Sequence, residues 1–329
     1  MFTPVHTSLG ALLLYQSSSS LLLHNGSVFG VSSLLSGFML NPSRDNVPII
    51  AGLMSSVVPF YLFMPSLLPT YPDAPSSWVS LLSTMGTGFL LGWGTKSGRG
   101  CTSGHMLCGL SRLSSRSFIA TAIFFTTALL TANFVSGIPP CPAGVPCYTP
   151  TYPSSPELSF ILSATALTFL TNTFIVPQML VRSERSRLIF SYLAGLQFGT
   201  GLFVSGMADP FKVLRFFAFP TDLTRFDPSL ALVILFGIVP SLIAYLTVKP
   251  GRQTSYDGRK IAKPTLAENW RLPTATVADI DWRFIFGATV FGVAWGLRGV
   301  CPGPAVLRSI LQPKWGFAEM VGYMLGNLI

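Results

Sequence analysis

Residues 229–248 read SLALVILFGIVPSLIAYLTV, twenty consecutive residues without a charged side chain. A helix of that length spans the roughly 30 Å hydrocarbon core of a bilayer. Apolar stretches of comparable length occupy residues 47–70, 117–135, 158–181 and 188–206. These five segments therefore predict helices that cross a membrane.

The composition of the whole chain supports that prediction. Only 10% of the 329 residues are charged, 50% are hydrophobic, and the mean hydropathy is +0.56. Soluble domains carry about 25% charged residues, so this chain has too few charges to cover a soluble surface of its size. A cytosolic enzyme, a disordered chain and a secreted disulfide scaffold are excluded as first interpretations. We expect an all-α polytopic membrane protein.

Several other apolar stretches are short or interrupted. Residues 28–40 and 316–329 are too short for a full crossing and predict oblique or re-entrant segments. The stretch at 8–23 is broken by the serines at 17–20, and it lacks the basic leader and cleavage site of a signal peptide. With the stretches at 78–95 and 283–299, we expect about nine membrane helices plus short re-entrant or broken helices, in a single permease domain over residues 1–329.

Charge in the loops predicts the orientation. The net charge is +9, and basic residues gather in the loops at 182–187 and 249–282, whereas residues 136–157 contain no Lys or Arg. Because basic loops stay in the cytoplasm, we expect those two loops inside, the third outside, and the protein in the plasma membrane. The polar segment 249–282 is predicted to be a cytoplasmic linker and the most disordered part. Nucleic-acid binding requires a basic face on a soluble domain and is excluded.

Two echoes in the sequence predict an internal duplication. Phe29-Gly30 with Ser36-Gly37 is echoed by Phe198-Gly199 with Ser205-Gly206, and Trp93-Gly94 with Cys101 is echoed by Trp295-Gly296 with Cys301. The repeats would cover about residues 8–135 and 158–329. Loop charges place residue 28 outside, so the two units would run in opposite directions, as in inverted-repeat transporters.

Glycine-rich stretches at 92–109, 195–210 and 292–304 predict broken helices, which mark binding sites in transporters. Cys101 lies in Gly100-Cys101-Thr102-Ser103-Gly104-His105, and Cys301 lies in Gly299-Val300-Cys301-Pro302-Gly303-Pro304. Thr or Ser favours a helix N-cap, and Pro favours the first helical turn. Both cysteines are thus predicted at helix N-termini, where an anion is favoured and a thiol gains reactivity. The alternative is that each cysteine only fills space in the core.

The other cysteines have different interpretations. Cys101, His105 and Cys108 have a spacing that metal ligands use, but a closed zinc site needs four ligands. We favour a capping or pore-lining His105 and a packing Cys108, with no metal and no cofactor. Cys141 and Cys147 could form a small-loop disulfide outside the cell, which the sequence leaves open. No GxxxxGK[ST] or HExxH string is present, so ATP-driven transport within this chain is unsupported.

The motifs resemble those of the YeeE/YedE-type sulfur transport family. The matching strings are Gly92-Trp93-Gly94, Gly100 to His105, Cys108 to Ser114, Ser205 to Pro210 and Cys301 to Ala305, in one order over residues 26–325. The resemblance implies an α-helical permease with inverted repeats that imports thiosulfate past a cysteine-lined constriction. It implies a relay in which successive thiols donate S–H···S hydrogen bonds to the terminal sulfur of the ion. The candidate substrate-binding residues are Gly100, Cys101, Thr102, Ser103, His105, Ser205, Gly206, Cys301, Pro302 and Gly303.

Three alternatives to a thiosulfate permease stay open. One is a membrane-bound sulfurtransferase that carries a persulfide on Cys101 or Cys301, which requires a thiolate nucleophile. A second is a redox-sensing or structural membrane subunit. A third is a permease for a related sulfur or selenium oxyanion. The expected partners are thiosulfate or a similar anion and the lipid bilayer, and a soluble cytoplasmic sulfur carrier is left open. Since the first repeat has no cysteine before Cys101, a relay there would begin at Ser36 and Gly37.

Overall fold

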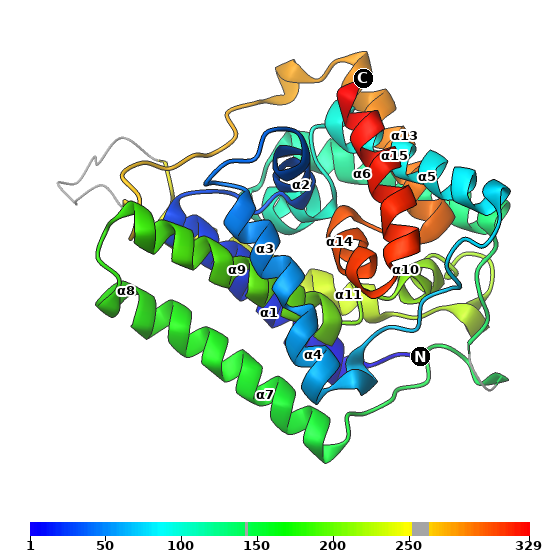
Figure 1. The fold of residues 1–329 in the computed structure, drawn as a ribbon, viewed down its shortest axis with the longest axis horizontal. Helices are drawn as coiled ribbons and strands as arrows, with labels where there is room; N and C mark the ends of the chain where they lie inside the picture. Colours follow the sequence, from blue (N-terminus) through cyan, green and yellow to red (C-terminus); the bar gives the residue numbers. More distant parts are fainter. Residues whose placement is uncertain (142–143, 252–262) are drawn as a thin grey trace.

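The computed structural model describes residues 1–141, 144–251 and 263–329, and within those ranges the regular elements are helices (Figure 1). Five helical segments are long and apolar enough to cross a membrane: Ser115–Val135, Ser155–Met179, Glu184–Val204, Ser229–Val248 and Trp282–Leu311. The protein is therefore an all-α integral membrane protein.

The α-helices follow one another along the chain with short connections. Their bounds are α1 (Pro4–Asn25), α2 (Val31–Leu40), α3 (Val47–Ser55), α4 (Val57–Phe63), α5 (Trp78–Ser97), α6 (Ser115–Thr131), α7 (Ser155–Leu170), α8 (Val176–Met179), α9 (Glu184–Val204), α10 (Pro210–Phe216), α11 (Ser229–Val233), α12 (Val239–Val248), α13 (Trp282–Arg298), α14 (Pro302–Leu311) and α15 (Pro313–Leu328). Wide π-type turns are η2 (Ser103–Gly109), η4 (Ala132–Ser136), η6 (Thr171–Ile175) and η8 (Ile234–Ile238). Short 3-10 turns are η1 (Pro65–Leu67), η3 (Leu110–Arg112), η7 (Leu223–Arg225) and η9 (Val277–Asp279).

Four of the five predicted crossings are confirmed as helices within a few residues, and the fifth is shorter than predicted. The stretch at 47–70 is helical only to Phe63, because Pro65 starts a 3-10 turn and an irregular loop follows. The prolines Pro177 and Pro240 do not end their helices. Each follows a wide turn, η6 or η8, which makes room for a residue that has no N–H to donate and that clashes with a carbonyl four residues back.

The serine run at 17–20 does not interrupt α1, contrary to the prediction. The Ser18 hydroxyl donates to the carbonyl of Leu14 at 2.8 Å, and that of Ser17 donates to Ala194 of α9 at 2.8 Å. Ser19 bonds to Ser241 of α12. These hydroxyls are satisfied inside the bundle, so the helix continues unbroken.

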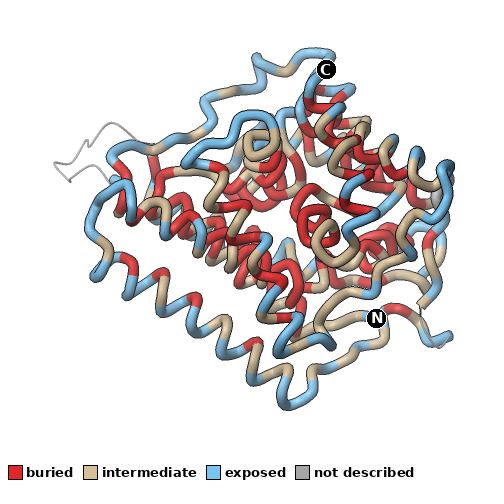
Figure 2. Tube along the Cα trace, in the orientation of Figure 1, coloured by how far each residue is buried: buried red, intermediate tan, exposed pale blue. Residues whose placement is uncertain are grey.

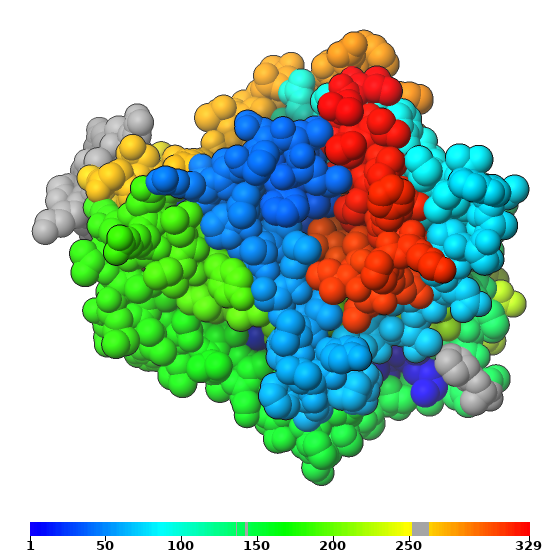
Figure 3. Space-filling model, in the orientation of Figure 1, coloured from blue at the N-terminus to red at the C-terminus, as the bar shows by residue number. Residues whose placement is uncertain are grey.

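Glycines set the closest helix contacts. Gly88 and Gly92 of α5 face Gly322 and Gly326 of α15, and a Cβ at any of the four would overlap backbone of the other helix. Small residues four apart let membrane helices approach closely. Figure 3 shows α15 lying against α5 on the same face.

The glycines at 195–201 have the same packing role, so the break predicted between 195 and 210 is wrong for most of its length. α9 is continuous to Val204, and a Cβ at Gly195 would overlap the carbonyl of Ile49 in α3. Only Gly206, with φ +74°, is in a turn that requires glycine.

Two ends of the molecule are distinguished by their contacts. The disulfide end consists of residues 1–3, 64–77, 137–141, 144–154 and 217–228. The basic end consists of residues 41–46, 180–187 and 263–281. At the basic end Asp45 pairs with Arg187 and Arg271, and at the disulfide end Ser66 bonds to Glu157.

The loop charges predict residue 28 outside because the turn at Arg44 and Asp45 is assigned to the cytoplasm, so the two should lie at opposite ends. The structure instead places them at the same end. Arg271, which pairs with Asp45, donates its backbone N–H to Gly26, and Asn25 bonds to Arg187. Because α1 is unbroken, it runs the whole way from the disulfide end to the basic end, whereas the sequence pattern predicted a break at the serines. Phe29 then precedes α2, whereas Phe198 lies within α9, so the first sequence echo joins different structural elements.

The structure describes part of the predicted linker 249–282. Residues 252–262 lie outside the described residues. The described segment beyond them is bound to the end of α1, because Leu266 donates its N–H to His24 and Thr265 donates to Leu23. Leu266 is buried. Figure 2 shows the buried core running through α1 and α9, with α7 largely exposed at the periphery.

Candidate functional site

A cavity of about 90 Å³ lies among α1, α9, η2, the α11–η8 segment and the start of α14. Cys101 and Cys301 both line it, although they come from opposite halves of the chain. Thr102, Ser103, Pro302 and Gly303 line it as well. Six of the ten predicted substrate-binding residues therefore meet around one space.

The Cys101 segment begins where α5 ends. Arg99 at φ +54° and Gly100 at φ +155° turn the chain, and His105 fills the space behind the turn. Its Nε2 lies 3.0 Å from the carbonyl of Gly98 and its Nδ1 lies 3.1 Å from Ser117 Oγ. His105 thus fastens the end of α5 to α6, and neither it nor Gly100 lines the cavity.

The Cys301 segment begins where α13 ends. Gly299, at φ +66°, closes α13, and Cys301 is the N-cap of α14 with Pro302 at the first helical position. The hydroxyl of Thr102 donates to Cys301 Sγ at 3.3 Å. This bond joins the two cysteine segments directly.

Ser103 connects the same region to a third helix. Its Oγ lies 3.2 Å from Cys101 Sγ and accepts a 3.0 Å bond from the N–H of Val31, the first residue of α2. The starts of α2, η2 and α14 therefore meet at the cavity. Helix N-termini carry a partial positive charge, so this arrangement favours an anion even though Ser103 already accepts the N–H of Val31.

The remainder of the wall is apolar and rich in sulfur. Met106 and Met207 line the cavity beside the two thiols, and so does Trp295. Sequence reasoning did not select these side chains as site residues. Met207 belongs to the Ser205 to Pro210 motif, which is one of the strings that match the family. The motif alone does not show which of its side chains points into the cavity.

Ser205 and Gly206 do not line this cavity. Ser205 is fully buried, and its carbonyl accepts a bond from Thr7. Gly206 borders a separate hollow at the disulfide end, together with His6, Asp209 and Lys212. The turn therefore presents Met207 to the cysteines and its neighbours Gly206 and Ala208 to the other side.

Cys108 lies apart from the other two free thiols, with its Sγ 3.5 Å from the carbonyl of Phe29. Among the residues that the structure describes, no three His, Cys, Asp or Glu side chains gather as metal ligands. Both ring nitrogens of His105 have protein partners.

Comparison with known proteins decides the family. A family described as sulphur transport matches residues 69–130, which contain the Cys101 segment, and a family of unknown function (DUF6691) matches residues 186–325. A probable transporter from Xylella fastidiosa strain Temecula1 is 36% identical over 129 residues, 39% of this chain and 91% of the relative. A second probable transporter, from strain 9a5c, is 37% identical over 120 residues, 36% of this chain and 73% of the relative.

The chain belongs to the YeeE/YedE-type sulfur transport family. It is a sulfur-related transporter of the membrane, and the cavity of Cys101 and Cys301 is its candidate substrate site.

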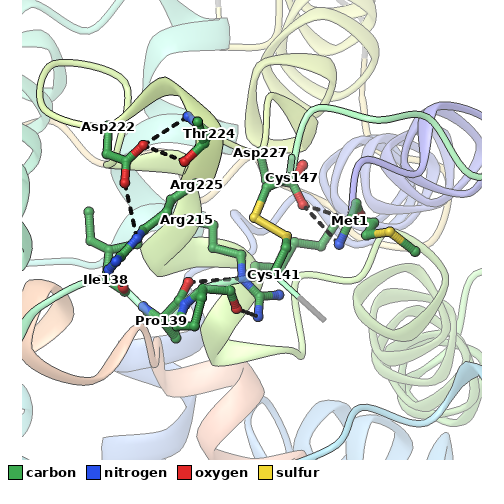
Figure 4. The surroundings of a disulfide bond; sticks show 12 residues. Met1, Ile138, Pro139, Cys141, Cys147, Arg215, Asp222, Thr224, Arg225 and Asp227 are labelled. Atoms are coloured by element: carbon green, nitrogen blue, oxygen red, sulfur yellow. Dashed lines mark hydrogen bonds and ion pairs between the residues drawn. A yellow bond between two sulfur atoms is a disulfide. The ribbon is translucent and has the colours of Figure 1, made fainter. Parts of the chain in front are cut away.

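In this sulfur transporter Cys141 and Cys147 form a disulfide with Cα atoms 5.4 Å apart. Figure 4 shows the surroundings, where Arg215 and Arg225 donate to carbonyls of the loop before Cys141. Cys147 accepts a bond from the N–H of Phe2. In the neighbouring exposed turn, hydrogen bonds from Thr224 lower the pKa of Asp222. The disulfide thus anchors the N-terminus and the loop at 217–228, far from the free thiols.

Proposed function

We propose that this transporter carries thiosulfate across the plasma membrane through the cavity of Cys101 and Cys301. The observation that carries the proposal is the convergence of two thiols and three helix N-termini on one otherwise apolar space. Thiosulfate has a charged oxygen end and a soft terminal sulfur. The helix N-termini favour the charge, and the thiols suit the sulfur, because a thiol is a weak hydrogen-bond donor.

The proposed mechanism is a relay of weak contacts. The terminal sulfur accepts an S–H···S bond from one thiol and then from the other, without a covalent step. No Lys or Arg lines the described wall of the cavity, so no fixed cation holds the ion tightly. Conduction needs sites that are strong enough to admit an ion and weak enough to release it. Sulfate lacks the soft sulfur and should pass poorly.

We further propose that the two halves form inverted repeats within about nine crossings, with the basic end in the cytoplasm. Two arrangements support this. The chain leaves α5, passes Cys101 and η2, and returns through α6; it leaves α13, passes Cys301 and α14, and returns through α15. In addition α5 packs on α15 while α13 packs on α6. Reciprocal packing of this kind is what a two-fold axis in the membrane plane would produce.

The test is uptake of sulfane-labelled thiosulfate by cells that lack their own sulfur importers. The variants Cys101→Ser and Cys301→Ser keep a small polar group but remove the soft thiol. The matched control is the double variant Cys141→Ser, Cys147→Ser, whose sulfurs lie far from the cavity. We expect uptake by wild type and control and its loss in the two cavity variants at equal membrane abundance. Absence of wild-type uptake from a correctly inserted protein would refute thiosulfate import.

A membrane sulfurtransferase is the second candidate, and one contact favours it. The hydroxyl of Thr102 donates to Cys301 Sγ, so the sulfur that would act as the nucleophile has a hydrogen-bond donor beside it. In a sulfurtransferase the Cys301 thiolate would attack the sulfane sulfur of thiosulfate, the S–S bond of thiosulfate would break, and sulfite would leave. Intact-protein mass spectrometry would detect the resulting persulfide as one added sulfur. Uptake without that mass supports the permease. Competition by sulfite, sulfate and selenium oxyanions would define the anion.

A further inference from the structure

A second pocket shares Leu107 with the cysteine cavity and lies on the side of it that faces the basic end. The same three walls enclose both. α1 contributes Leu14 to the first and Ser18 to the second, and the α11–α12 segment contributes Ile238 to the first and Ser241 to the second. These pairs are about one helical turn apart, so the two pockets are adjacent compartments.

Leu107 of η2 separates the two compartments. It lines both of them and is almost fully buried. Opposite it lies Gly237 of η8, where an added Cβ would stand 3.2 Å from Leu107 Cδ1. A leucine packed against a glycine therefore lies where the two compartments adjoin.

The second compartment contains groups that bind anions. The thiol of Cys108 and the guanidinium of Arg112 both line it. Arg112 is half-buried and donates its Nε to the carbonyl of Cys108 at 2.9 Å. Among the described residues no carboxylate forms an ion pair with Arg112, whereas Arg182 at the basic end pairs with Glu268. A half-buried guanidinium without a carboxylate favours an anionic ligand.

We propose that this compartment is a second binding site for the transported sulfur anion, in which Arg112 binds the oxygens and Cys108 contacts the sulfur. The inference rests on the proposed function and extends it. After the anion leaves Cys101 and Cys301 it passes between Leu107 and Gly237 and is bound near Arg112 before release at the basic end. No covalent bond forms or breaks. Cys108, a packing residue in the sequence interpretation, is here a ligand.

Binding is tested without transport by chemical modification of arginine. Purified full-length protein is treated with phenylglyoxal, and the modification of Arg112 and Arg116 is compared by peptide mass mapping. Arg116 lies on the neighbouring helix, over the ring of Phe284, and lines neither cavity. Thiosulfate should slow the modification of Arg112 and leave that of Arg116 unchanged, and sulfate should protect Arg112 less. Equal rates at Arg112 with and without thiosulfate would overturn the proposal.

Transport gives the second test. Because a hydrogen bond to a charged group contributes about 1.5–3 kcal/mol, Arg112→Gln should lower thiosulfate uptake about tenfold or more, while Arg116→Gln should change it little. Gly237→Ala should narrow the passage and slow uptake, and Leu107→Ala should restore the rate in that background. Normal uptake by Arg112→Gln would contradict the second site. Absence of uptake by the wild-type protein would instead contradict the proposed function. In that case the protection of Arg112 from phenylglyoxal would still show whether thiosulfate binds at the second site.

Discussion

Thr102 donates a hydrogen bond to the sulfur of Cys301 at 3.3 Å, although the two residues are 199 positions apart. The bond fixes the position of Cys301 relative to the Cys101 segment and gives the sulfur a defined acceptor role. This contact therefore joins the two halves of the chain directly at the cavity, between the residue after Cys101 and the thiol of Cys301.

Replacing Thr102 by Val keeps the shape of the side chain and removes the donor. We expect uptake to fall about two- to tenfold, because one neutral hydrogen bond contributes about 0.5–1.5 kcal/mol. Thr102→Ser keeps the hydroxyl and should retain most activity. Initial rates of thiosulfate uptake at matched abundance provide the measurement. Equal rates for the Val and Ser variants would mean that the bond has no part in transport.

His105→Ala separates a structural from a substrate-binding role. The substitution leaves the Gly98 carbonyl and the Ser117 hydroxyl without their partner in a buried region. We expect a loss of about 2–4 kcal/mol in stability, since an unsatisfied buried group costs about 1–3 kcal/mol and a cavity is added.

Thermal unfolding in detergent measures that loss, and Ser117→Ala, which removes one of the two bonds, should show a smaller one. Uptake per folded molecule should stay near the wild-type value in both variants. A His105→Ala protein that unfolds at the normal temperature but no longer transports would return His105 to the list of substrate ligands.

Hydropathy predicted most of the membrane-spanning helices, because a long apolar segment is visible in the local sequence without any knowledge of its neighbours in the fold. It placed the segments at 117–135, 158–181, 188–206 and 229–248 close to their observed bounds. The unbroken α1 could not be predicted, because the partner of Ser17 is Ala194, a residue 177 positions away. The same limit applies to Gly195 and Gly199, whose role depends on α3 lying beside them.

Part of the candidate site could likewise be predicted, because some of its features depend only on the local sequence. The glycines and prolines in the sequence located both helix breaks. Cys101, Thr102 and Cys301 were therefore correctly predicted to lie at the site. Local patterns do not tell which way a side chain turns, and this explains the selection of His105 and Ser205 and the omission of Met106 and Met207. Leu107 carries no chemical signal at all in sequence, and only the two cavities identify its position.

Close packing of α5 on α15 predicts a sharp contrast between two glycines of one helix. A Cβ at Gly88 would overlap the carbonyl of Glu319, whereas Gly86 has no atom within 4 Å of its Cβ position. We expect Gly88→Ala to separate the helices and cost roughly 1–3 kcal/mol, as overpacking does. Gly86→Ala should be neutral or stabilising by up to about 1 kcal/mol, since alanine is the better helix former.

Unfolding of the two variants under identical detergent conditions gives the comparison. A stability of Gly88→Ala equal to that of Gly86→Ala would show that α5 and α15 are not in the close contact described.

At the disulfide end, Lys212 and Asp227 form an ion pair at 3.3 Å with exposed fractions of 6% and 0%. Lys212 Nζ also donates to the carbonyl of Met1 and to Thr3. Removing one charge of a buried pair leaves the other unpaired, so Asp227→Asn should cost about 3–5 kcal/mol. The loss should loosen the N-terminus, which this cluster holds.

The matched control is Asp222→Asn, which breaks the exposed pair with Arg225 in the same loop. Exposed pairs contribute little, so little change is expected at pH 7. Hydrogen bonds from Thr224 lower the pKa of Asp222; its contribution is therefore present above the ordinary aspartate pKa of about 3.9 and is lost as the pH falls through the lowered value. Thermal unfolding at pH 7 and at pH 3 compares the two variants. A large loss for Asp222→Asn together with a small one for Asp227→Asn would contradict the assignment of the buried pair as the anchor of this end.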